Sequence, residues 1–287
     1  MSYLGPSEMA PLFGKSAVTK SNFSNSQLVV YAILGGAYIA LGALLALLVT
    51  GGMPQVAATN PGIIKLIAGL LFPMGIVLVV LAGGELFTSD CAIIPFGVLE
   101  KRISFNNIIR ILLLVYVGNA IGAFLVAYFG AYVSGVLTAK PWSDTVIKLA
   151  VHKTEASFWV CFTKGIFANW LVCLAVWLSY AAKNVSGKIL GLWLPVMCFV
   201  ALGMEHSIAN LFYLPTALLL GAPLSIQTVL IKNLLPATLG NFIGAFALVT
   251  LPYWYLFGKK QTKQIDFEKE NFQVTEKPTI VYINSNN

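Results

Sequence analysis

The sequence has few charged residues, no close pairs of cysteines and only two histidines, and each shortage narrows the class of protein. Charged residues make up 10% and hydrophobic residues 58% of the 287 residues, whereas about 25% of a soluble domain is charged. The four cysteines lack CxxC spacing and lie in or beside apolar runs, so we expect buried thiols rather than disulfides or metal ligands. The composition predicts a protein embedded in a lipid bilayer, without a metal or another cofactor.

Two further absences concern the N-terminus and the distribution of charge. The first 27 residues lack a basic start followed by an apolar block, so no cleavable signal peptide is predicted. The net charge is +7, but lysine and arginine are dispersed among the loops, which favours contact with a membrane surface over nucleic-acid binding. We expect a cytoplasmic N-terminal segment (residues 1–27), a membrane domain (28–257) and a cytoplasmic tail (258–287) in a cell-membrane protein.

Long apolar runs, by contrast, are abundant. A helix that crosses about 30 Å of hydrocarbon needs about 20 residues, and six segments satisfy this requirement: residues 27–50, 63–99, 107–133, 156–182, 189–220 and 226–257. The second and fifth segments are too long for single helices, and GGELFTSD and GMEHSIAN interrupt them. Irregular backbone is tolerated at membrane depth where protein covers it or where it lines a wet cavity. We therefore predict an all-α membrane protein with six transmembrane helices, of which the second and fifth are broken.

A short motif occurs twice. GNAIGAF (residues 118–124) recurs as GNFIGAF (240–246), and each copy follows an interrupted segment that contains a glutamate. Each half of the chain contributes three segments, and because three is odd, the second half enters the membrane from the opposite side. This pattern predicts an inverted 3+3 repeat with a transport site at the paired interruptions. A small-residue packing face that recurs by chance is the alternative.

Few ionisable side chains lie inside the apolar segments, where each costs about 2.5 to 3.5 kcal/mol. Glu85, Lys164, Glu205 and His206 are the ones that require an explanation. We expect Glu85 and Glu205, with Asn210, to organise the helix breaks by accepting hydrogen bonds from freed backbone groups. An imidazole titrates near neutral pH, so His206 is a candidate for proton exchange or hydrogen bonding. The alternative is a neutral histidine packed in the core.

Four segments together resemble a known family. LAGGELFTS (residues 81–89), NWLVCLAVW (169–177), GMEHSIANLF (203–212) and NLLPATLGN (233–241) are similar to segments of the formate/nitrite transporter family, in the same order, over residues 28–257. The resemblance implies an aquaporin-like fold of six helices and a homopentamer with one pore in each subunit.

The resemblance also implies pore residues. His206 matches the family's central histidine, Lys153 the lysine that faces the outer vestibule and tunes that histidine, and Asn241 the asparagine that is hydrogen-bonded to it. Thr88 matches the gate-like residue in the loop that breaks the second span. Asn169 matches an asparagine of the fourth span near the pore.

Three apolar residues match the family's constrictions. Phe72 and Ile76 correspond to an inner hydrophobic slit and Phe199 to an outer constriction. Lys164 departs from the family, because relatives usually have an apolar residue there. It either adds a positive charge near the pore or extends from an oligomer contact.

These features together predict transport of small monovalent weak-acid anions. A basic mouth formed by Lys153, Lys140 and Lys148 would attract anions, and apolar collars on both sides of His206 would exclude a bare ion. A proton would make the anion a neutral acid, supplied either by His206 or by water. Formate is the expected substrate, and nitrite and hydrosulfide are alternatives within the family.

Other classes of function are weighed against this one. An aquaporin-like channel for neutral solutes would share the broken helices, but the sequence lacks paired NPA motifs. An ammonium conductor would require two pore histidines and a mouth that attracts cations. An enzyme would require an oriented nucleophile and base, whereas Ser207 is merely adjacent to His206. We therefore predict a protein that is not an enzyme. A sensor or structural membrane protein remains an alternative that an absence of anion flux would support.

Overall fold

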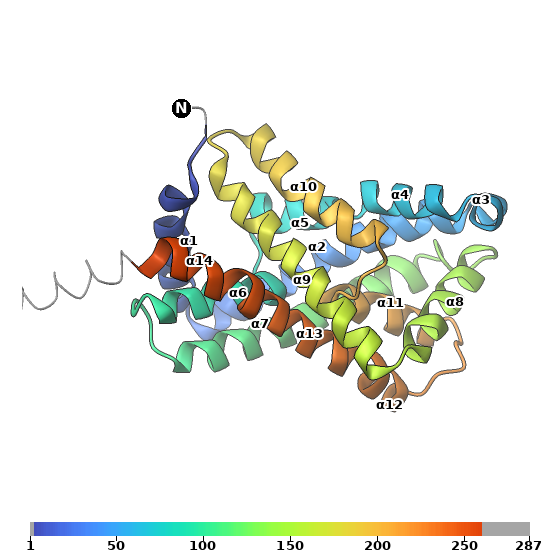
Figure 1. The fold of residues 1–287 in the computed structure, drawn as a ribbon. Coiled ribbons are helices and arrows are strands. Elements are labelled where there is room, and N and C mark those ends of the chain that lie inside the picture. Colours follow the sequence, from blue (N-terminus) through green and yellow to red (C-terminus); the bar gives the residue numbers. More distant parts are fainter. Residues whose placement is uncertain (1–2, 260–287) are drawn as a thin grey trace, which may run out of the picture.

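The computed structural model describes residues 3–259 and is built from helices (Figure 1). Within these residues the β-type pairing is an isolated bridge between Tyr3 and Ala182, so the prediction of an all-α protein is confirmed. The tail predicted for residues 258–287 lies, from residue 260 onward, outside the described residues. The elements are α1 (Pro6–Ser21), α2 (Asn25–Gly51), α3 (Pro54–Thr59), α4 (Pro61–Leu71), α5 (Met74–Leu78), η1 (Val79–Gly83), α6 (Phe87–Leu99), α7 (Asn106–Leu125), η2 (Val126–Val133), α8 (Trp142–Glu155), α9 (Phe158–Ala181), α10 (Val185–Ala201), α11 (Ser207–Leu219), α12 (Ile226–Val229), η3 (Leu230–Leu234), α13 (Leu235–Ala245), η4 (Phe246–Thr250), α14 (Leu251–Tyr253) and η5 (Trp254–Gly258), where η marks π-helical turns.

Several helical stretches have the length and apolar composition that a membrane span requires. Within residues 3–259 there are five of them: Asn25–Gly51, Pro61–Gly83, Asn106–Val133, Phe158–Ala181 and Ile226–Gly258. They overlap the first, second, third, fourth and sixth segments expected from the sequence. The protein is therefore a membrane protein built mainly from apolar helices of spanning length.

The second and fifth expected segments are each divided into two helical stretches by a short non-helical turn. The first helix of each pair ends close to a glycine with left-handed backbone, Gly83 (φ 93°) and Gly203 (φ 71°), a conformation that is unstrained only for glycine. The chain then continues without helical structure until α6 begins at Phe87 and α11 begins at Ser207. Each of these helices has 13 residues and is about 20 Å long at 1.5 Å per residue. Neither helix is long enough to cross a bilayer alone.

Both copies of the GNxIGAF motif form close contacts between helices. In α7, a Cβ on Gly122 would overlap the backbone carbonyl of Ile33 in α2, and in α13 a Cβ on Gly244 would overlap that of Ile166 in α9. Glycine permits this approach because it has no side chain, as at many helix crossings in membranes. The motif therefore fixes two helix pairs, α2 with α7 and α9 with α13.

The N-terminal segment is a packed part of the structure. Helix α1 lies beside α14, at the end of the bundle opposite α8 and α12 (Figure 1). Its Phe13 ring is buried and makes edge contacts with the rings of Phe96, Trp177 and Tyr180 at centroid distances of 5.3, 5.2 and 5.7 Å. Aromatic pairs with this geometry add stability beyond the area that they bury. The segment therefore covers one end of the helix bundle.

Lys20, near the end of α1, forms ion pairs with two residues of the adjoining helix start. Its Nζ contacts a carboxylate oxygen of Glu85 and lies 2.9 Å from Oδ1 of Asp90. Burial lowers the pKa of Lys20, but the carboxylates of Asp90 and Glu85 outweigh it and raise the pKa above its ordinary value. The lysine therefore stays charged, and Glu85 interacts with a side chain instead of the freed backbone groups that we expected, because a buried carboxylate gains more from a cation.

Candidate functional site

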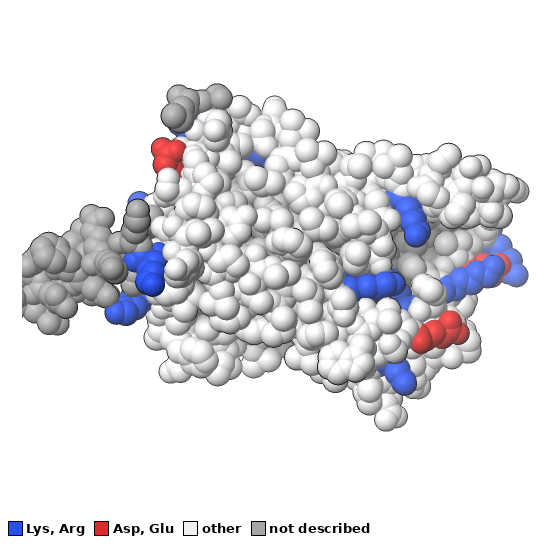
Figure 2. All heavy atoms as spheres, viewed as in Figure 1, with Lys and Arg blue, Asp and Glu red and all other residues white. Residues whose placement is uncertain are grey.

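A cavity of about 380 Å³ opens between the helices at the end of the bundle that contains α8. Its wall includes exposed residues, such as Lys65 and His152, and buried residues, such as Lys153 and His206. Basic side chains border the hollow on this face of the molecule (Figure 2). The imidazole is thus 3% exposed and borders this cavity.

The position of His206 determines which ring nitrogen carries the proton. The residue lies directly before α11 in extended backbone, and its Nδ1 accepts a hydrogen bond from the N–H of Ala209 at 3.1 Å. A neutral imidazole has one acceptor nitrogen and one donor nitrogen. The proton of the neutral ring is therefore on Nε2, which lies 3.0 Å from Oγ1 of Thr88. The ring serves both as a helix cap and as a hydrogen-bond donor.

Thr88, which the family resemblance predicted, lies next to His206, and Asn169, predicted in the same way, is hydrogen-bonded to Thr88. Thr88 is fully buried in the first turn of α6, and its hydroxyl meets the histidine ring. Its carbonyl accepts a hydrogen bond from Nδ2 of Asn169 at 3.0 Å and a weaker one from the thiol of Cys173. Asn169 also donates to the carbonyl of Asn241 at 2.7 Å. The first turn of α6 is thus held by α9.

The structure corrects the role expected for Asn241. Its Oδ1 accepts from the N–H of Ser207 at 2.8 Å, and its Nδ2 donates to the carbonyls of Gly165 and Glu205 at 2.8 and 2.9 Å. These bonds hold the backbone on both sides of His206, whose ring is bonded to Thr88 and Ala209. The expected hydrogen bond to the imidazole is wrong because unpaired N–H and carbonyl groups at the helix start take all the polar atoms of the amide.

Asn119, in the other copy of the motif, makes the same three kinds of bond. Its Oδ1 accepts from the N–H of Phe87 at 2.9 Å, and its Nδ2 donates to the carbonyls of Ala32 and Glu85 at 2.7 and 2.8 Å. For each asparagine, one of the two accepting carbonyls belongs to the glutamate of its half, Glu85 or Glu205. The N–H that donates to the amide oxygen belongs to the residue two positions after that glutamate. The asparagine of each motif therefore holds the non-helical turn of its own half.

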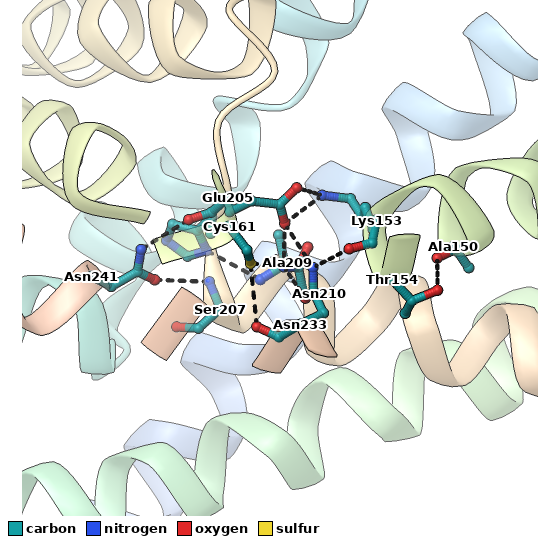
Figure 3. A network of polar contacts seen from close by, with 11 residues as sticks. Ala150, Lys153, Thr154, Cys161, Glu205, Ser207, Ala209, Asn210, Asn233 and Asn241 are labelled. Atoms are coloured by element: carbon teal, nitrogen blue, oxygen red, sulfur yellow. Dashed lines mark hydrogen bonds and ion pairs between the residues drawn. The ribbon is translucent and has the colours of Figure 1, made fainter. Parts of the chain in front are cut away.

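Glu205 interacts with side chains. Its carboxylate lies 3.0 and 2.9 Å from Nζ of Lys153 and accepts from Nδ2 of Asn210 at 2.7 Å and of Asn233 at 3.2 Å (Figure 3). The prediction that it would accept from backbone groups is wrong, because the motif asparagine already satisfies part of that backbone. Asn233, which the sequence analysis did not assign, also donates to the carbonyl of Lys153 at 3.1 Å. The sequence feature that could have identified Asn233 is a polar amide within an apolar segment.

The apolar residues form a different arrangement from the one expected. The rings of Phe72 and Phe199 meet edge to face at 5.7 Å, and both line the cavity that contains His206. Phe199 stacks on the imidazole at 5.6 Å with an interplanar angle of 17°. Phe72 therefore lies on the same side of His206 as Phe199, and its assignment to a separate inner slit is wrong. Ile76 is buried one turn further along the same helical stretch.

The lysines at the cavity also differ from those expected. Lys153 lines the cavity. Lys140 and Lys148 are not part of the cavity wall, and Nζ of the exposed Lys140 lies 3.5 Å from Oδ2 of Asp144. Lys65 and Lys164 occupy the wall instead. Spacing along the sequence could not show this, because the cavity wall contains residues of α2, α4, α8, α9, α10 and α11. The interpretation of Lys164 as a charge near the pathway is the one that the geometry favours.

A basic cavity that leads to a buried imidazole among apolar helices is typical of a membrane transport protein. The formate/nitrite transporter family model matches residues 7–255, and the chain belongs to this family. It is 40% identical over 273 residues to a probable formate transporter of Methanothermobacter thermautotrophicus (90% of this chain, 99% of the relative) and 33% identical over 272 residues to the formate channel FocA of Escherichia coli (strain K12; 88% and 94%).

Two solved structures are also similar. One is described as an FNT family ion channel (TM-score 0.80, 29% identity, 86% of this chain and 98% of the other), and one as a pentameric formate channel with formate bound (TM-score 0.71, 30% identity, 81% and 97%). Membership in this family confirms the prediction of a membrane transporter and not an enzyme.

Proposed function

We propose that this protein conducts formate, or another small monovalent weak-acid anion, through a pathway that passes His206. The observation that carries the proposal is the Nε2–H of a buried imidazole at the inner end of a basic cavity. Relatives that are described as formate channels and transporters support formate as the substrate. Nitrite and hydrosulfide are the alternatives to be compared in the same assay.

The proposed architecture has six spans in an inverted 3+3 repeat, with broken second and fifth spans. Support comes from Asn119 and Asn241, which hold the turns at Glu85 and Glu205 through matching hydrogen bonds. We place both termini in the cytoplasm, because that orientation puts more lysine and arginine on the inner side. By analogy with the pentameric formate channel, five copies would assemble with one pore in each.

In the proposed mechanism, lysines around the cavity raise the local concentration of anions. At the contact between Phe72 and Phe199 an ion loses hydration and gains no polar partner. His206 then donates a hydrogen bond from Nε2 to the carboxylate oxygen. Complete transfer of that proton from a neutral ring would leave an imidazolate, and Nδ1 is already occupied by the N–H of Ala209. We therefore assign His206 to hydrogen-bond donation. The proton that makes the acid neutral comes from a hydronium ion of the surrounding solution, which becomes water.

Labelled formate uptake into proteoliposomes tests this function. The matched variants are His206→Asn, whose short amide can still cap α11 but lacks the Nε2 donor, and His206→Gln, which extends a donor but caps poorly. We expect His206→Asn to fold and to lose about 10- to 100-fold of the flux, since a hydrogen bond to a charged group is worth about 1.5 to 3 kcal/mol. Uptake by the intact protein no faster than by empty vesicles, or faster swelling with glycerol than with formate, contradicts the proposal.

A further inference from the structure

Lys153 is a weak candidate for attracting anions, because its charge is already neutralised. Both carboxylate oxygens of Glu205 lie within 3.0 Å of its ammonium group, and Lys153 is 9% exposed. An anion that bound to this lysine would have to separate a buried ion pair, which is costly. Three lysines and one glutamate line the cavity, so its remaining positive charge belongs to Lys65 and Lys164.

Lys164 has the geometry of an anion-binding residue. Its side chain lines the cavity, and within residues 3–259 neither Lys164 nor Lys65 forms an ion pair. Lys164 is seven positions into α9, about 9 Å from the start of that helix at 1.5 Å per residue. An ammonium group without a carboxylate partner is expensive at such depth unless water or an anion solvates it. The cavity gives water and small anions access to Lys164.

The backbone at Lys164 is fixed to the turn that contains His206. The N–H of Glu205 approaches the carbonyl of Lys164 at 3.4 Å, and the next carbonyl, that of Gly165, accepts from Asn241 at 2.8 Å. Gly165 packs against α13 so closely that a Cβ there would lie 2.9 Å from a backbone oxygen. The backbone from which the Lys164 side chain extends is therefore held beside the turn that contains His206, and the side chain lines the same cavity as the imidazole.

We propose that Lys164, assisted by the exposed Lys65, forms a binding site for a small monovalent carboxylate at the mouth of the cavity, before the Phe72–Phe199 contact. This inference rests on the proposed function and names the residues that capture its substrate. Lys65 attracts the anion from solution, Lys164 holds it inside the cavity, and the anion then passes to Nε2 of His206. The pair of Lys153 with Glu205 positions the turn and is not the capture site.

The test is formate uptake by the full-length protein in proteoliposomes, measured against concentration at low (~20 mM) and higher (~300 mM) ionic strength. Lys164→Met keeps the length of the side chain and removes its charge, whereas Lys164→Arg keeps the charge. Lys148→Met is the matched control, since Lys148 is an exposed lysine outside the cavity wall. We expect Lys164→Met to raise the half-saturating formate concentration about 3- to 10-fold at low ionic strength, with unchanged maximal flux, and the difference to shrink at high ionic strength.

Each outcome decides between capture and other roles. The site is supported if Lys164→Arg keeps the half-saturating formate concentration of the intact protein and if Lys65→Met/Lys164→Met raises it further than Lys164→Met does. An equal effect of Lys148→Met, a lower maximal flux at unchanged half-saturation, or an effect independent of ionic strength overturns it. Absence of formate uptake by the unaltered protein overturns the proposed function instead, so the two failures are distinguishable.

Discussion

The hydroxyl of Thr88 and Nε2 of His206 lie 3.0 Å apart, although 118 positions separate them in the sequence. Each residue belongs to the start of a 13-residue helix that follows a non-helical turn. Because Nδ1 of the ring is an acceptor, the donor in this bond is Nε2. The donor that we assign to substrate thus already has a neutral oxygen, the hydroxyl of Thr88, as its partner. A carboxylate that replaces the hydroxyl exchanges a neutral hydrogen bond for a stronger charge-assisted one.

Thr88→Val tests this exchange. The variant removes the internal partner of His206, so the Nε2–H is free for formate. We expect the half-saturating concentration of formate to fall about 2- to 10-fold, since a neutral hydrogen bond contributes about 0.5 to 1.5 kcal/mol. Maximal flux should fall as well, because no internal group displaces the bound anion. Concentration-dependent uptake measures both quantities. Thr88→Ser keeps the hydroxyl and is the control. Identical curves of uptake against formate concentration for Thr88→Val and Thr88→Ser would exclude the replacement of the hydroxyl by the carboxylate.

The asparagines of the two GNxIGAF copies should be equally important for stability. Asn119→Ala and Asn241→Ala each leave one N–H and two carbonyl groups without their partner in a buried place. Each unsatisfied group costs about 1 to 3 kcal/mol. We expect both variants to lower the melting temperature in detergent by similar amounts, and Asn60→Ala, at an exposed position, to leave it unchanged. A large decrease in melting temperature for only one of the two asparagine variants would contradict the equivalence of Asn119 and Asn241.

Much of this arrangement follows from the sequence, because local chemistry determines it. Glycine at positions 83 and 203 and the repeated small-residue motif locate the helix ends and the tight crossings within a few residues. The partners of Glu85 and Glu205 could not be predicted in this way. Lys20 and Lys153 come from helices outside the repeated segments, and their distance in sequence has no relation to their distance in space. The error at Phe72 has the same origin, since its partner Phe199 belongs to the other half.

Lys20 should be necessary for the docking of α1. Lys20→Met leaves Glu85 and Asp90 without their cation in a buried place, and removal of one partner of a buried pair costs about 3 to 5 kcal/mol. We expect a lower melting temperature and faster proteolysis of α1, with partial recovery in Lys20→Met/Asp90→Asn. Lys15→Met, at an exposed position of the same helix, is the control.

The pH dependence of that effect has a definite sign. The folded-state pKa of Lys20 is raised above its ordinary value by the two carboxylates, which outweigh burial. A lysine with a raised pKa contributes its full stability below the unfolded value of about 10.4 and loses it only as the pH rises through the folded value. The stability that Lys20 contributes, measured as the difference between the intact protein and Lys20→Met, should therefore not fall between about pH 7 and 9. A difference that falls within that range would show that Lys20 is not held as a cation.

The ion pair between Lys153 and Glu205 should behave as one unit. Lys153→Met leaves a carboxylate uncompensated in the cavity wall, so it should reduce both stability and formate uptake, the latter about tenfold or more, because like charges brought together cost several kcal/mol. Glu205→Gln leaves the lysine unpaired, with a smaller effect on uptake because a cation still faces the anion. In Lys153→Met/Glu205→Gln neither charge remains, and both quantities should recover toward those of the intact protein. Melting temperatures and uptake rates of all four proteins form a double-mutant cycle, and additive losses in that cycle would mean that the two residues act independently.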